Sequence, residues 1–168
     1  MKRYAWYSLF VISIFSGFSG CVKQENYPDV PQIKLLNYTN VFDTGQYAVR
    51  GILNISFTDG DGDIGLNPGD TSPPFNAAGL YYYNYVIKYF EKQQGVFKLI
   101  DLSPPFSARI PVLNREFPGK PIKGIISDTL GLNVHPLFDT IKFEAFIYDR
   151  TLNQSNVIST PEIILKRP

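Results

Sequence analysis

The chain has 168 residues, one cysteine, and 16 lysines and arginines against 15 aspartates and glutamates. The near-neutral charge does not indicate a nucleic-acid-binding protein, which would show a basic patch. A single cysteine excludes an intramolecular disulfide. The length suits one domain, and 13 glycines, 13 prolines and 15% aromatic residues favour an all-β protein over a helical one.

Residues 1–20 have the parts of a secretory signal. Lys2 and Arg3 give a basic start, an apolar stretch runs to Phe18, and small residues follow. The apolar stretch is too short and too weakly flanked for a spanning helix. We therefore expect a signal peptide over 1–20, and its removal leaves 14 basic and 15 acidic residues, a formal charge of −1.

Cys21 follows the small residues directly, at the end of the apolar stretch. This arrangement resembles the lipobox of bacterial lipoproteins, which implies that the thiol is acylated and begins the mature chain. Phe18 departs from the pattern, which usually has an aliphatic residue there. The alternative is an ordinary signal peptide with a free thiol nearby. Acylation would anchor the protein to a membrane without spanning it.

The residues after Cys21 are polar and contain prolines, so 21–31 are predicted to form a lipidated N-terminus and tether. Lys23 and Glu25 resemble in part the signal that exports lipoproteins of Bacteroidota to the outer face of the outer membrane. The resemblance implies an outer-membrane lipoprotein exposed at the surface. A periplasmic location remains an alternative.

Residues 32–168 are predicted to form an immunoglobulin-like antiparallel β-sandwich of seven or eight short strands. In Ala48–Phe57 one face carries Val49, Leu53, Ile55 and Phe57 and the other carries Arg50, Asn54 and Ser56, which is typical of a half-buried strand. The turn Lys92-Gln93-Gln94-Gly95 predicts a hairpin. In chain order, the expected strands are Gln32–Asn37, Ala48–Phe57, Tyr81–Glu91, Val96–Leu102, Ala108–Leu113, Ile122–Ser127, Thr140–Asp149 and Asn156–Leu165.

The segment Ile141–Asn156 strengthens the sandwich interpretation. An alternating strand runs into Asp149, then into an Asn153-Gln154-Ser155 turn, then into a final strand. This resembles the end of bacterial immunoglobulin-like and fibronectin type III modules.

The acidic run Asp59-Gly60-Asp61-Gly62-Asp63-Ile64-Gly65 is the main candidate for chemistry. Three neighbouring carboxylates repel one another unless a positive charge lies among them. Ca²⁺ takes six to eight oxygen ligands and suits carboxylates on a glycine-rich loop. An EF-hand is excluded because Ile64 stands where that loop needs glycine and because no helical pattern flanks it. A calcium loop of another geometry is expected.

Strand phase adds a ligand to this site. In each of two predicted strands, alternate residues face the core. Asp59 is the next such position after Ala48–Phe57, and Asp149 is the last such position in Thr140–Asp149. Facing strands that end at the same pole would bring the two side chains together. We therefore predict a structural Ca²⁺ site from Asp59, Asp61, Asp63 and Asp149. Asn153 and Ser155, on the following turn, are candidates either for further oxygen ligands or for bracing the loop. The alternative is an acidic surface turn, since Asp-Gly is a common turn dipeptide.

The block Phe57–Gly65, followed downstream by Asp149-Arg150 and Ser155-Asn156, resembles an uncharacterised family of Bacteroidota lipoproteins. The resemblance spans nearly the whole mature chain and implies no activity.

A tyrosine cluster, Tyr81, Tyr82, Tyr83 and Tyr85, is a candidate surface for a glycan or a protein partner. The alternative is that tyrosines simply cover a sheet face. His135 lacks a metal-ligand pattern around it. We find no phosphate-binding loop, zinc motif or nucleophile elbow. The expected function is therefore a non-enzymatic binding or accessory module of the cell envelope that docks to another protein. A carbohydrate-binding surface lipoprotein is the alternative, and a hydrolase is less favoured.

Overall fold

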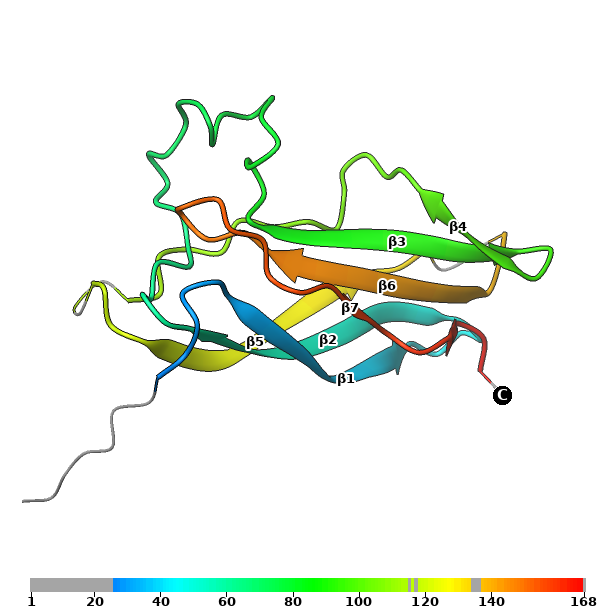
Figure 1. Ribbon diagram of the computed structural model, residues 1–168. Helices are drawn as coiled ribbons and strands as arrows, with labels where there is room; N and C mark the ends of the chain where they lie inside the picture. Colours follow the sequence, from blue (N-terminus) through cyan, green and yellow to red (C-terminus); the bar gives the residue numbers. More distant parts are fainter. Residues whose placement is uncertain (1–25, 115, 117, 134–136, 168) are drawn as a thin grey trace, which may run out of the picture.

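The computed structural model describes residues 26–114, 116, 118–133 and 137–167, which form eight strands in two antiparallel sheets (Figure 1). The described part of the chain is all-β, and its two sheets pack face to face as a β-sandwich. None of the described segments is a helix long and apolar enough to cross a membrane.

The first sheet contains β1 (Gln32–Phe42), β2 (Ala48–Asp59) and β5 (Ile122–Gly131), in the order β1-β2-β5. The alternation predicted for β2 is confirmed: Leu53, Ile55 and Phe57 are buried, and the residues between them are partly exposed. β1 pairs with β2 along its length, with a register shift between Leu35 and Asn37. This shift is a β-bulge, which leaves Leu36 outside the ladder.

The second sheet contains β3 (Tyr85–Gln93), β4 (Val96–Ile100), β6 (Thr140–Ile147) and β7 (Ile158–Ser159), in the order β4-β3-β6-β7, and β8 (Ile163–Ile164) also pairs with β6. The predicted hairpin joins β3 to β4. Gln94 and Gly95 have φ angles of 52° and 82°, and two consecutive positive φ angles are the mark of the tight hairpin turn that matches strand twist.

The core lies between the two sheets. β2 contributes Leu53 and Ile55, and β6 contributes Ile141 and Phe143, all of them at most 1% exposed. Burying an aliphatic or aromatic side chain of this size stabilises the fold by about 1.5–3 kcal/mol. The ring of Phe143 lies 5.6 Å from that of Tyr89, centroid to centroid, which adds tilted aromatic contact to the burial.

The first and sixth predicted strands extend beyond their predicted ends, to Phe42 and Gly131, and three other predicted strands are broken or start later than expected. The segment predicted to begin at Tyr81 becomes a strand only at Tyr85, and Ala108–Leu113 makes isolated bridges at Ala108 and Pro111. The last predicted strand divides into the two-residue strands β7 and β8, on either side of Pro161. Proline donates no backbone hydrogen bond, which explains the interruptions at 111 and 161. The predicted signal peptide, the acylated Cys21 and His135 lie outside the described residues.

Candidate metal centre

The acidic loop begins where β2 ends. Asp59 is the last residue of β2, and the next six residues turn beneath the segments around Pro111 and Lys120. Gly62 and Gly65 have φ angles of 68° and 118°, and a Cβ atom at either position would lie within 2.3 Å of a backbone carbonyl oxygen. Only glycine fits both the conformation and the space, so the glycines of the run shape the loop.

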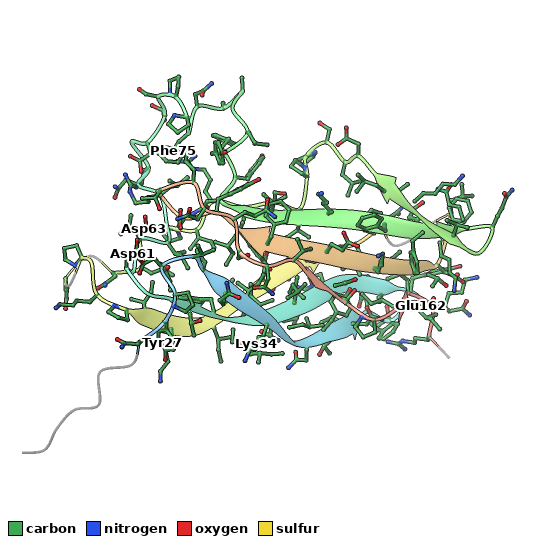
Figure 2. The ribbon with its side chains drawn as sticks, in the orientation of Figure 1. Tyr27, Lys34, Asp61, Asp63, Phe75 and Glu162 are labelled. Carbon is green, nitrogen blue, oxygen red and sulfur yellow. The ribbon has the colours of Figure 1, made fainter. Side chains whose placement is uncertain are left out.

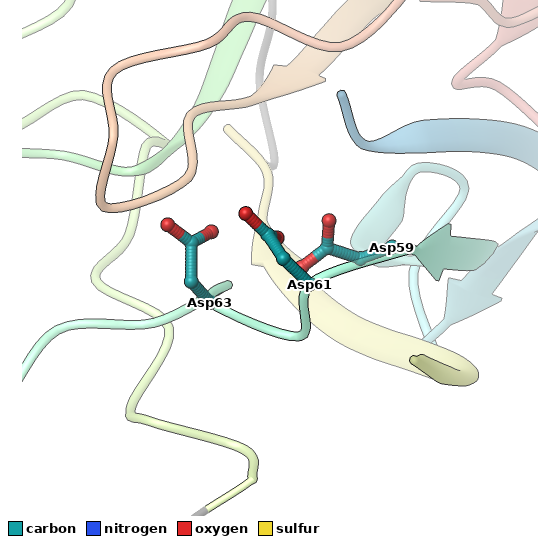
Figure 3. Close-up of side chains that lie close together, drawn as sticks. All are labelled: Asp59, Asp61 and Asp63. Atoms are coloured by element: carbon teal, nitrogen blue, oxygen red, sulfur yellow. The ribbon is translucent and has the colours of Figure 1, made fainter. Parts of the chain in front are cut away.

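Asp59, Asp61 and Asp63 converge on one point (Figure 3). One carboxylate oxygen from each lies within 4.8 Å of those of the others. Asp59 is 0% exposed, and Asp61 and Asp63 are half-buried. Three acids this close and this buried destabilise the fold unless their charge is compensated.

The hydrogen bonds of the loop leave part of each carboxylate unsatisfied. The backbone N–H of Ile64 donates to Oδ2 of Asp59 at 3.2 Å, and that of Thr151 donates to Oδ2 of Asp63, also at 3.2 Å. The Oδ1 atoms of Asp59, Asp61 and Asp63 are buried and accept no hydrogen bond from any of the residues that the structure describes. Buried polar atoms are normally satisfied. Three unsatisfied anionic oxygens in one loop could hold a metal ion.

Burial and mutual repulsion raise the pKa of two of these carboxyls. Burial, followed by the charges of Asp61, Asp63 and Asp149, raises the pKa of Asp59 to about 7. Burial, with the charges of Asp149 and Asp61, also raises the pKa of Asp63, although the N–H groups of Arg150 and Thr151 oppose the shift. In the absence of a cation, the loop therefore resists full ionisation at neutral pH.

Asp149 lies beside this cluster, after the end of β6. It is 1% exposed, and its charge acts on both Asp59 and Asp63. Its Oδ1 accepts hydrogen bonds from the Asn153 N–H at 2.8 Å and the Thr151 hydroxyl at 3.1 Å, and its Oδ2 accepts one from Nδ2 of Asn153 at 2.9 Å. Asp149 therefore also organises the turn that follows it.

Ser155 closes the same turn. Its side chain is buried, and its Oγ accepts a hydrogen bond from the Ile147 N–H at 3.0 Å and donates one to the Asn156 carbonyl at 2.8 Å. The structure thus brings the turn after β6 against the acidic loop after β2. Two direct links join them: the Thr151 N–H donates to Asp63, 88 positions away in the chain, and Nη1 of Arg150 donates to the Gly65 carbonyl at 3.4 Å.

Two arginines to which the sequence assigned no role hold the long loop 66–83 next to this centre. Nη1 of Arg150 lies 2.6 Å from Oδ2 of Asp70, and its guanidinium lies 5.9 Å from the ring centroid of Phe75. Phe75 lies in this loop, on the same side of the molecule as Asp61 and Asp63 (Figure 2). The bond from Arg150 holds the pKa of Asp70 below its usual range. The sequence signal was its position next to Asp149.

Arg109 is the second arginine. Its Nη1 donates to the carbonyls of Tyr82 at 2.8 Å and Phe75 at 3.4 Å, and its Nη2 to those of Asp70 at 3.0 Å and Asn67 at 3.3 Å. Five fixed donors allow one guanidinium to satisfy several carbonyls of an irregular loop. No motif in the sequence marks this role.

The substitution Arg109→Met is expected to loosen loop 66–83. It leaves four carbonyls without their donor, and we expect the free energy of unfolding to fall by about 2–3 kcal/mol. Limited proteolysis should cut within the loop several times faster than in the wild type. Lys98→Met, at an exposed position of β4, is the matched control. Equal cleavage of the two variants would contradict this role.

The tyrosine cluster does not form one exposed surface. Tyr85 is 1% exposed and lies in the core. Tyr81 packs edge-on against Tyr148, and Tyr82 packs edge-on against Tyr83. The rings of Tyr81, Tyr82 and Tyr83 are partly exposed in the turn before β3, so burial removes only Tyr85 from the predicted ligand or partner surface.

The raised pKa of Asp59 predicts how the stability of the metal-free protein depends on pH. In the folded state the pKa of this carboxyl is about 7, whereas its ordinary pKa is 3.8. Because the folded state binds this proton more tightly than the unfolded state, Asp59 contributes stability at low pH, and this contribution is lost as pH rises through about 7. In a chelator, we expect the protein to be about 2 kcal/mol more stable at pH 5.5 than at pH 8.

Urea unfolding at the two pH values measures this difference. Asp59→Asn cannot titrate and should show a smaller slope than the wild type. A slope unchanged by this substitution would assign the pH dependence to other groups.

Comparison with known proteins finds no matching family model, no matching curated protein and no matching solved structure.

Proposed function

We propose that the protein is a non-enzymatic binding or accessory module of the cell envelope, a lipoprotein anchored through Cys21, with one pole held by a structural calcium ion. The observation that carries the calcium site is the convergence of Asp59, Asp61 and Asp63, each with a buried oxygen that no protein group satisfies.

The chemistry of the cluster favours calcium over other metals. All three ligands are carboxylates, and zinc and copper sites are usually built from histidine and cysteine. Magnesium needs a strict octahedron, whereas calcium accepts six to eight oxygens in a flexible arrangement. Asp149 and Asn153 lie in the adjacent turn and would complete the oxygen set with water.

The role proposed for the ion is structural. The acidic loop follows β2 of one sheet, and the Asp149 turn follows β6 of the other. A cation between them would link the two sheets at one pole and neutralise their mutual repulsion. It would stabilise the fold because the unfolded chain does not hold these carboxylates together.

We further propose that the sandwich is of the immunoglobulin-like type. The sheet orders β1-β2-β5 and β4-β3-β6-β7 are those of strands A-B-E and C′-C-F-G in that fold, when the strands are lettered in chain order. The chain crosses between the two sheets in the connections from β2 to β3, from β4 to β5 and from β5 to β6.

The proposed cellular location rests on the sequence. Residues 1–20 with Cys21 support a lipoprotein signal, and Lys23 with Glu25 supports export to the outer membrane of a Bacteroidota cell. Such a protein would reach its partner, another envelope protein or a glycan, from a membrane anchor.

Two measurements on the full chain, expressed in a host that acylates lipoproteins and purified in detergent, test this proposal. Calorimetric titration should show one calcium site, absent from Asp61→Asn/Asp63→Asn and retained in Asp101→Asn, which changes an exposed acid. Mass spectrometry should find acyl chains on Cys21 and none on Cys21→Ser. Absence of calcium binding would overturn the metal site, and an unmodified Cys21 would overturn the anchor.

A further inference from the structure

The long loop 66–83 follows the acidic run directly and leads to β3. It protrudes from one end of the sandwich (Figure 1). Its own turns are closed by backbone hydrogen bonds, from the Phe75 N–H to the Ser72 carbonyl at 2.9 Å and from the Gly79 N–H to the Asn76 carbonyl at 2.7 Å. Loops of this length without regular structure are usually either functional or disordered, and this one is ordered.

The loop presents an almost uncharged surface to solvent. Leu80 is 71% exposed, and the three tyrosines that follow it are partly exposed. The only charged residue of the loop is Asp70, and its carboxylate forms an ion pair with Arg150. The one charge of the loop is therefore used to attach it to the rest of the protein, and apolar and phenolic groups are left for contact with a partner.

Arg150 connects this loop to the candidate metal centre. Nη1 of its side chain donates to Oδ2 of Asp70 at 2.6 Å and to the carbonyl of Gly65, the last residue of the acidic run, at 3.4 Å. Its guanidinium also lies 5.9 Å from the ring centroid of Phe75. One side chain thus contacts the loop at two points and the acidic run at a third.

The position of Arg150 depends on the carboxylates of the metal centre. The residue after it, Thr151, donates its N–H to Oδ2 of Asp63 at 3.2 Å and its hydroxyl to Oδ1 of Asp149 at 3.1 Å. Figure 3 shows this turn beside Asp63. The charges of Asp63 and Asp149 repel each other. A cation shared by the two carboxylates would remove this repulsion and hold the turn that carries Arg150 against the acidic run.

Arg109, the second arginine that holds the loop, is anchored elsewhere. It follows Ala108, whose carbonyl accepts a hydrogen bond from the Tyr85 N–H at 3.0 Å at the start of β3. Its guanidinium donates to four carbonyls of the loop. The attachment through Arg109 therefore persists with or without a metal, whereas the attachment through Arg150 responds to it.

We propose that calcium regulates loop 66–83, and that Arg150 is the positioning residue that transmits occupancy of the metal centre to the loop. The inference rests on the calcium site proposed above. With calcium bound, the turn 149–153 is held against the acidic run, and Arg150 fixes Asp70 and Phe75. Without calcium, the turn is held less firmly and the loop opens more often. Calcium therefore controls whether the loop presents one fixed surface to a partner.

Hydrogen exchange measured by mass spectrometry on the full chain, with calcium and with a chelator, tests this inference. Calcium is expected to slow exchange of the amides of residues 67–82 about tenfold, because a hydrogen bond to a charged group must break before the loop opens. The turn between Gln93 and Val96, at the opposite end of β3, is the internal reference. Its amides should exchange at the same rate in both conditions.

Two variants break the link from its two ends, and both should still bind calcium in a calorimetric titration. In Arg150→Met, calcium should no longer slow exchange in the loop. In Asp70→Asn it should slow exchange less than in the wild type, because a neutral amide keeps only a weaker bond. Asp70 lies outside the acidic run, so this variant also serves if Arg150→Met does not fold.

The controls Lys98→Met and Asp101→Asn make similar changes of charge at exposed positions and should behave as the wild type. The readout is the ratio of the exchange rates in chelator and in calcium. A purely structural role of Arg150 would speed loop exchange equally in both conditions and leave this ratio unchanged.

The remaining outcomes separate this inference from the metal site. Calcium binding without slower exchange in the wild-type loop would overturn the inference and leave the metal site intact. Slowing that persists in full in both Arg150→Met and Asp70→Asn would overturn the role of Arg150. Absence of calcium binding to the wild type would overturn the metal site and this inference together.

Discussion

Calcium at a hundredfold excess over its Kd is expected to raise the melting temperature of the protein by about 10 °C. The excess corresponds to about 2.7 kcal/mol of stabilisation, and for a domain of this size each kcal/mol shifts Tm by roughly 3–4 °C. The physical reason is that the ion satisfies the buried oxygens of Asp59, Asp61 and Asp63. Thermal melts with calcium and with a chelator measure the effect.

The effect of Asp61→Asn on the melting temperature should have opposite signs in chelator and in calcium. In chelator it removes a charge that raises the pKa of Asp59, so the variant should melt above the wild type. In calcium it lacks a ligand and should melt below. Asp101→Asn, at an exposed acid, should follow the wild type in both conditions. A variant that melts higher in both conditions would show an acidic turn without a metal.

Asp149→Ala is expected to lower the free energy of unfolding by about 3 kcal/mol even in chelator. The carboxylate is 1% exposed and accepts hydrogen bonds from Thr151 and from both nitrogens of Asn153. Bonds to a charged acceptor contribute about 1.5–3 kcal/mol each, and relief of repulsion with Asp59 and Asp63 offsets part of the loss. Urea denaturation measures the difference.

Asp149→Asn separates the two roles of this residue. It preserves one acceptor oxygen for the turn and removes the charge, so it should unfold closer to the wild type than Asp149→Ala does. If Asp149 is also a calcium ligand, Asp149→Asn should bind calcium more weakly than the wild type. Unchanged affinity would restrict its role to holding the turn.

Strand phase was the most reliable information in the sequence. Side chains of a strand alternate between faces, so the apolar residues of β2 and β6 showed which face is buried. The same alternation placed Asp59 and Asp149 inward, and both are fully buried in the structure. These inferences needed only neighbouring residues, and the physical rule behind them is local.

Contacts between distant segments were not predictable in the same way. Arg109 binds carbonyls 27–42 positions away in the chain, and irregular loops have no periodic pattern. The tyrosine run also reads locally as a strand. The start of β3 is fixed instead by Asn84. The buried side chain of Asn84 accepts a hydrogen bond from the Ile110 N–H at 2.6 Å and donates one to the Ile110 carbonyl at 3.2 Å.

Asp128, the inward-facing acid of β5, affects how molecules of this protein behave when they are crowded together. β5 has ten residues and, within the part of the chain that the structure describes, pairs only with β2, so one side of it is an open sheet edge. Such an edge invites pairing with the same edge of another molecule, and the lipid anchor proposed for Cys21 would make such encounters frequent by confining the molecules to a surface. Burial raises the pKa of Asp128, and a strand added alongside would bury this charge further. The fold therefore opposes the fusion of neighbouring sheets into aggregates at high surface density.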